Sequence, residues 1–168
     1  DGTLMSTQWT SSSSIAYDYT RFFVVDQNDG TCNAGGPIYC TITQAVTAVP
    51  AVLTGATTIL VKAGTYNESV TVSGKTTTAV NTLTIKEATG ETAILDGTGL
   101  GGTAIGFHIN GEGYVIVDGF EVRNFGSAGI KYVNSDNGTI QNNVVHDSGS
   151  TGPVSGIWLG DGVGGGSN

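Results

Sequence analysis

IGFHINGEGYVIVDGFEVRNFGSAGIKYVNSDNGTIQNNVVHDSGSTGPVSGIWLG, residues 105–160, contains an internal repeat. Gly106 and Gly129 each open a short alternating run, GFHIN and GIKYV. The same step along the chain separates Val117 from Ile140, and a third run, GIWLG, begins at Gly156 after the insertion STGPV. Short β-branched and aromatic runs that recur at a fixed period between Gly, Asn, Asp and Ser are typical of a solenoid. Since the period is shorter than the ~30 residues of a βαβ unit, the stretch predicts a parallel β-helix with one repeat per coil.

The composition fits such a fold and narrows the set of partners. A chain of 168 residues predicts one domain, and its 27 glycines with only 12 % charged residues suit a chain that turns often. The net charge of −8 argues against nucleic acid and anionic membrane surfaces and is compatible with divalent cations. No apolar run approaches the ~20 residues of a membrane-spanning helix, so we expect no membrane insertion.

The N-terminal segment, residues 1–20, differs from the rest of the chain. It is rich in Ser and Thr but also carries large apolar side chains, namely Leu4, Met5, Trp9, Ile15, Tyr17 and Tyr19. Two interpretations stay open: a frayed leader, or a strand that lies along the solenoid of its own copy or of a neighbouring copy. The run RFFVVD, residues 21–26, predicts the first buried strand, and residues 21–168 are expected to form the β-helix domain.

The two cysteines, Cys32 and Cys40, close a short loop. Their spacing predicts a disulfide in a secreted, extracellular or cell-surface protein, with two free thiols or half of a metal site as the alternatives. A chain that starts at Asp1 is compatible with a cleaved signal peptide or with a fragment. The sequons at Asn67 and Asn137 are candidate glycosylation sites.

One segment, TITQAVTAVPAVL at residues 41–53, has a helical pattern. Thr41 or Thr43 is the expected N-cap, and Pro50 ends the segment. Apolar residues fall at helical spacing at Ile42, Ala45, Val46 and Val49. The sequence therefore predicts a capping helix near residues 41–50, which covers the open end of the solenoid core.

Strand-like runs continue from residue 57 to the repeat. The spacing from Ile59 to Leu83 and the spacing from Val72 to Ile94 each differ by a single residue from the step between Gly106 and Gly129. We expect the same approximate coil length to extend back to the helix.

The runs ILVKAGTYNESVTV, LTIKEATGETAILDG, GFHINGEGYVIVDGFEVRN and GTIQNNVVHDSG resemble the right-handed parallel β-helix proteins of the pectate-lyase-like superfamily. The resemblance covers roughly residues 22–162. It implies three sheets along a right-handed, single-stranded coil with an N-terminal capping helix. The superfamily includes polysaccharide lyases, glycoside hydrolases, epimerases and noncatalytic domains, so the resemblance does not fix an activity.

Aligned on the step from Gly106 to Gly129, two sets of side chains stack inside the coil: Phe107, Ile130 and Ile157, and Ile109, Tyr132 and Leu159. His108, Lys131 and Trp158 form an outward column, one residue per coil and ~4.8 Å apart. Three interpretations stay open for this column. It is a glycan site in which Trp158 stacks on a sugar and Lys131 neutralises a uronate or acts as a base, a polar surface without a function, or a subunit contact.

A second column contains Asp96, Asp118 and Gln141, with His146 and Asp147 one strand further along. Lyases of the superfamily hold calcium with several carboxylates opposite a basic residue. The resemblance therefore implies Asp96, Asp118 and Asp147 as candidate Ca²⁺ ligands and Lys131 or Arg123 as the base. Asp96-Gly97 and Asp118-Gly119 are equally ordinary turn dipeptides, and a complete lyase site is not evident. We expect Asn142 and Asn143 to have a structural role at a turn.

The leading functional hypothesis is a secreted, noncatalytic structural protein that associates with copies of itself, head to tail or as a filament. Its contacts would be residues 1–20 and the last coil, GIWLG, because the sequence shows no second cap and an open coil exposes apolar side chains and strand edges. The alternatives are a calcium-dependent polysaccharide lyase, or a fragment of one, acting on an acidic glycan, and a glycan-binding module.

Overall fold

A computed structural model describes residues 21–149 and 155–160, and the N-terminal segment discussed above lies outside the described residues. The described part contains fourteen β-strands and one α-helix. The chain enters through β1 (Phe22–Val25), β2 (Ile38–Tyr39) and α1 (Ile42–Ala48). Four coils follow: β3 (Thr57–Val61), β4 (Gly64–Tyr66) and β5 (Val70–Val72); β6 (Leu83–Glu87), β7 (Ala93–Asp96) and β8 (Ile105–Asn110); β9 (Val115–Asp118), β10 (Glu121–Arg123) and β11 (Ala128–Val133); β12 (Thr139–Gln141), β13 (Val144–His146) and β14 (Ser155–Gly160).

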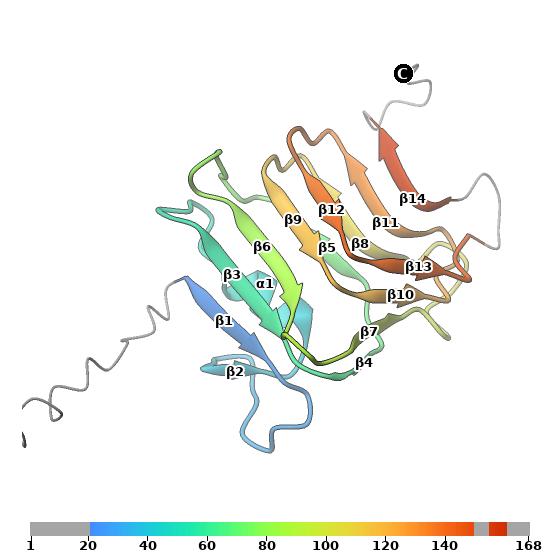
Figure 1. Cartoon of the computed structure of the whole chain (residues 1–168), viewed down its shortest axis with the longest axis horizontal. Helices are drawn as coiled ribbons and strands as arrows, with labels where there is room; N and C mark the ends of the chain where they lie inside the picture. The colour runs from blue at the N-terminus through green and yellow to red at the C-terminus, as the bar shows by residue number, and fades with distance from the viewer. Residues whose placement is uncertain (1–20, 150–154, 161–168) are drawn as a thin grey trace, which may run out of the picture.

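Each coil contributes one strand to each of three sheets (Figure 1). The first sheet has the order β12-β9-β6-β3-β1-β2, the second β13-β10-β7-β4 and the third β14-β11-β8-β5. Every strand pair in the described ranges is parallel. The prediction of an all-β fold with three parallel sheets and a solenoid-like path is therefore confirmed.

The register confirms the inward ladders of the repeat. Phe107 pairs with Ile130 and Ile130 with Ile157, while Ile109, Tyr132 and Leu159 pair in the same way. Side chains at matching positions of successive strands stack inside the coil. Fully burying one such side chain contributes ~1.5–3 kcal/mol.

The coil length predicted for the earlier coils is wrong. Ile59 pairs with Ile85 rather than Leu83, and Val72 pairs with Ile109 rather than Ile94. The reason is that the coils differ in length. The first-sheet register pairs Thr57 with Leu83 and Leu83 with Val115. In both pairs the two residues are further apart along the chain than Val117 and Ile140, because longer loops follow β5 and β7.

Glycines and asparagines of the repeat allow neighbouring coils to approach closely and join them by hydrogen bonds. A Cβ on Gly106 would clash with the carbonyl oxygen of Gly129, so the coils approach too closely there for any other residue. Asn143 Nδ2 donates to the carbonyl oxygen of Val117 at 2.9 Å, and its Oδ1 accepts from the backbone N–H of Phe120 at 2.9 Å. The predicted structural role of Asn143 is confirmed by these bonds.

The capping helix is also confirmed, with Thr41 as its N-cap. The Thr41 hydroxyl accepts from the Gln44 backbone N–H at 3.1 Å, and the Gln44 side chain accepts from the Thr41 N–H in return, a capping box. The Glu68 carboxylate accepts from the backbone N–H groups of Ile42 at 2.7 Å and Thr43 at 2.9 Å. A carboxylate on these free donors is stabilising at the positive end of a helix.

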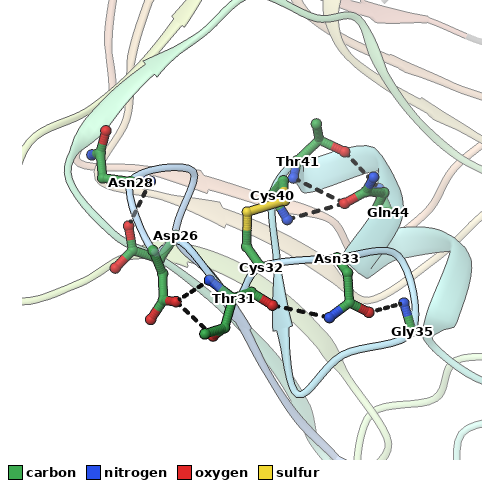
Figure 2. Close-up of a disulfide and its surroundings, with 10 residues drawn as sticks. Asp26, Asn28, Thr31, Cys32, Asn33, Gly35, Cys40, Thr41 and Gln44 are labelled. Carbon is green, nitrogen blue, oxygen red and sulfur yellow. Dashed lines mark hydrogen bonds between the residues drawn. A yellow bond between two sulfur atoms is a disulfide. The ribbon is translucent and has the colours of Figure 1, made fainter.

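The loop before the helix carries the predicted disulfide. Cys32 and Cys40 are joined, and no free cysteine remains among the described residues. Figure 2 shows the bond beside the capping box, where the Cys40 N–H donates to the Gln44 side chain at 3.0 Å. The disulfide thus ties the loop directly to the start of α1.

Candidate functional site

The outward column of the third sheet exists as the sequence predicted. Thr71, His108, Lys131 and Trp158 pair in register across all four coils. The Lys131 Nζ lies 4.0 Å from the centroid of the Trp158 ring, a cation–π contact. Trp158 is 41 % exposed. Lys131 therefore already lies over this ring, which the sugar-stacking interpretation would assign to a glycan.

His108 lies between Thr71 and Lys131 in this column. Its Nε2 atom is buried and has no hydrogen-bond partner among the described residues. Burial lowers the pKa of the ring, and the nearby charge of Lys131 lowers it further. His108 therefore loses its proton more readily than an isolated histidine.

The second sheet carries a charged network that crosses three coils. Arg123 Nε contacts Asp96 Oδ2 at 2.9 Å, and its Nη1 contacts Glu121 Oε1 at 2.8 Å. The same Glu121 oxygen lies 3.3 Å from His146 Nε2, and His146 Nδ1 lies 2.7 Å from Asp147 Oδ2. The groups come from β7, β10 and β13 and from the residue after β13. The network ties neighbouring coils together on the outer face of the sheet.

The pKa values of the network follow from these contacts. Desolvation acts to raise the pKa of Asp96, but hydrogen bonds from Thr98, Arg123 and Asn124 outweigh it and hold that pKa well below its usual range. The hydrogen bond with Asp147 raises the pKa of His146, and the contact with Glu121 adds to this effect. Near neutral pH, Asp96 is thus ionised, whereas His146 gains protons more readily than an isolated histidine.

The structure does not bring the three candidate calcium ligands together. Asp96 lies in the second sheet, paired with Arg123. Asp118 lies in the first sheet, where it accepts from Gln141 Nε2 at 3.0 Å and Asn142 Nδ2 at 2.8 Å. Asp147 contacts His146. Across residues 21–149 and 155–160, no group of three or more His, Cys, Asp or Glu side chains could hold a metal ion.

The two alternative lyase bases also lie apart. Lys131 belongs to the third sheet and Arg123 to the second. The hydrogen bond to Asp96 raises the pKa of Arg123, and Glu121 does so as well. A guanidinium held protonated by two carboxylates is poorly suited to accept a proton.

The two sequons have different surroundings. Asn67 Nδ2 donates to the carbonyl oxygens of Asp96 at 2.7 Å and Thr98 at 3.0 Å, so this amide links two coils. Asn137 is exposed in the turn between β11 and β12, with φ of 57°. Sequence reasoning missed the role of Asn67 because its partners lie in the next coil, far along the chain.

The last coil, β12–β14, presents apolar side chains to solvent; we call it the C-terminal coil. In the inward ladders Ile130 and Tyr132 are 0 % and 4 % exposed, whereas Ile157 and Leu159 in the next strand are 44 % and 64 % exposed. A hollow of about 330 Å³ beside them is lined by Tyr132, Ser135, Asn137, Gly138, Ile140, Leu159 and Gly160. Within the described ranges, β12, β13 and β14 each end their sheet and pair with no further strand.

Comparison with known proteins does not add a family to this description: no protein-family model, curated protein or solved structure matches the chain. Among the described residues, no helix is long and apolar enough to cross a membrane. The exposed C-terminal coil is the feature of the described structure that bears most directly on function.

Proposed function

We propose that this chain is an extracellular, noncatalytic structural module that associates with copies of itself through its C-terminal coil. We further propose that its coil is right-handed and of the pectate-lyase-like type, as the sequence resemblance implies. The observation that carries the functional proposal is the exposure of Ile157 and Leu159, which occupy ladder positions that are buried one coil earlier.

The energetics favour covering this end. Each large aliphatic side chain that is fully removed from water contributes ~1.5–3 kcal/mol. The unpaired backbone groups of an edge strand are also a template for a further strand. The net charge of −8 on each copy opposes association, so we expect association to strengthen as salt screens this repulsion.

Two further observations support the other parts of the proposal. The Cys32–Cys40 disulfide is typical of proteins that mature in an oxidising, extracytoplasmic compartment. Of the residues of the lyase hypothesis, Asp96 and Arg123 pair with each other in the second sheet, whereas Asp118 lies in the first sheet and Lys131 lies in the third sheet over the Trp158 ring. This arrangement favours a structural role over catalysis on a polyuronate.

Sedimentation velocity of the whole chain over a wide range of protein concentration tests the proposal. The wild-type chain should form larger species as its concentration rises, and Leu159→Lys should stay monomeric. Val80→Lys is the matched control, because Val80 is 77 % exposed but lies in the loop after β5, outside the C-terminal coil. A wild-type chain that sediments as a monomer throughout, or a Leu159→Lys variant that associates like Val80→Lys, would overturn the proposal.

A further inference from the structure

Helix α1 occupies a position at which the repeating path of the chain would place a strand of the third sheet. In each coil a third-sheet strand precedes the first-sheet strand of the next: β5 precedes β6, β8 precedes β9, and β11 precedes β12. By the same path, a third-sheet strand beside β5 would be expected between β1 and β3, and the residues before β1 would form a third-sheet strand one coil further out. Helix α1 instead packs against β5, and its Thr43 hydroxyl donates to the carbonyl oxygen of Ser69 at 3.4 Å.

The sequence of the segment before β1 nevertheless has a strand pattern. In IAYDYT, residues 15–20, large apolar side chains at Ile15, Tyr17 and Tyr19 alternate with Ala16, Asp18 and Thr20. Period-two alternation of aromatic and β-branched residues is typical of a half-buried strand. The chain thus combines a strand-like sequence directly before β1 with a third-sheet edge, β14, that pairs with no further described strand.

The open edge of the same copy is out of reach for these residues. Tyr19 lies two residues before Arg21 and therefore within ~7 Å of it in a fully extended chain. In the first sheet, β1 and β12 are four strand spacings apart, which is ~19 Å. Residues 15–19 can therefore run along the C-terminal coil of a second copy but not along their own.

Charge selects the register. If Tyr17 and Tyr19 stack on Ile157 and Leu159, Asp18 lies on the outer face beside Trp158. The ammonium group of Lys131 already lies 4.0 Å from that ring, within the same outward column. A shift by two residues would place Ala16 there and leave Lys131 without an acidic neighbour from the added strand.

We propose that residues 15–19 of one copy add to β14 of a second copy as a further parallel strand, with Tyr17 and Tyr19 on the inward ladders and Asp18 beside Lys131. This inference rests on the proposed self-association and names the segment that covers the C-terminal coil. Because donor segment and open edge lie at opposite ends of the molecule, the contact is heterologous and repeats from copy to copy.

Sedimentation velocity of full-length variants tests the inference. Tyr17→Lys should weaken association by more than about tenfold, because it removes an aromatic side chain from the inward face. Asp18→Lys and Lys131→Asp should each weaken it about three- to fivefold, and the double variant should recover most of the loss. Asp1→Lys makes the same charge change outside residues 15–19 and serves as the control.

The outcomes separate this inference from the proposed function. If the wild-type chain never associates, both are overturned. If Leu159→Lys abolishes association while Tyr17→Lys leaves it unchanged, the C-terminal coil is the interface but residues 15–19 do not cover it. Failure of the double charge swap to restore what the single variants lose would overturn the register with Asp18 beside Lys131. The result expected is that the double variant recovers most of the lost association, whereas Asp1→Lys associates like the wild-type chain.

Discussion

The two ends of the solenoid are built differently. At the N-terminal end α1 packs against β5, β1 and β3, and the loop after β1 reaches the turn between β3 and β4, where Asn28 Nδ2 donates to the carbonyl oxygen of Ala63 at 3.0 Å. A hollow of about 460 Å³ remains beside Phe22, Phe23, Pro37 and Tyr39. At the C-terminal end β12, β13 and β14 are the last described strands of their sheets (Figure 1). The Ile157 and Leu159 side chains are exposed there.

The difference shows that one ladder of side chains can serve two purposes. In the middle of the stack a ladder residue is covered by coils on both sides and stabilises the fold. At an open end the same position is covered on one side only, so it contributes less to folding and is available for association. The closed end, by contrast, depends on a disulfide, a capping box and a carboxylate rather than on a neighbouring coil.

The largest expected contrast is between two isoleucines of one ladder. Ile130→Ala should lower the free energy of unfolding by ~2–5 kcal/mol, because Ile130 is fully buried. Ile157→Ala should lower it by less than ~1 kcal/mol, because Ile157 is 44 % exposed. Urea unfolding at low protein concentration, where copies do not associate, measures both. Equal losses for the two variants would show that the C-terminal coil is covered.

The stability of the N-terminal end should depend strongly on the disulfide. Replacing both Cys32 and Cys40 by Ser should lower the free energy of unfolding by ~2–4 kcal/mol, since the bond restricts the unfolded chain. Self-association, once measured at a temperature where the variant is folded, should not change. Urea unfolding and sedimentation velocity check the two parts. A loss of association in the folded double variant would contradict the separation of the two ends.

A smaller effect is expected from the carboxylate at the start of α1. Glu68→Ala removes the acceptor for the backbone N–H groups of Ile42 and Thr43 and should cost ~1 kcal/mol. Ser69→Ala is a neighbouring control, because the bond that Ser69 makes to Thr43 uses only its backbone carbonyl. Thermal unfolding of both variants measures the difference. Equal unfolding temperatures would show that Glu68 does not stabilise the start of α1.

The smallest expected effect concerns pH and the open end. The pKa of His146 is raised in the folded protein, so its contribution to stability is fully present below the unfolded value of about 6.5 and is lost as pH rises through the folded value. His146→Gln should therefore lower the unfolding temperature slightly at mildly acidic pH and leave it unchanged at alkaline pH. Calorimetry at several pH values provides the measurement. A difference that grows as pH rises would have the opposite sign and refute the assignment.

Local patterns in the sequence predicted much of the fold. The capping helix, the disulfide and the ladders of the last three coils all depend on residues that lie near one another in the chain or are separated by regular steps. The earlier register was not predictable in this way, because loop length between strands has no periodic signal. Ile59 and Leu83 looked aligned only because an average step was applied to a longer coil.

The polar sites show the same limit. Asp96 and Asp118 are almost one repeat apart in sequence, which suggested a shared column, but the longer second coil places them in different sheets. The actual partner of Asp96 is Arg123, which lies in the following coil. Likewise Asn67 matched a glycosylation motif, whereas its amide links two coils through partners that no local pattern identifies.

The loop after β7 has a practical consequence for redesign. Residues 98–103 are exposed, and they lengthen one turn of the solenoid while the strands on either side keep their pairing. An insertion between Gly99 and Gly101 would add surface while keeping Thr98, whose carbonyl oxygen accepts from Asn67. The molecule thus separates the part that must stay constant for coils to stack from a part in which new recognition surfaces can be grafted.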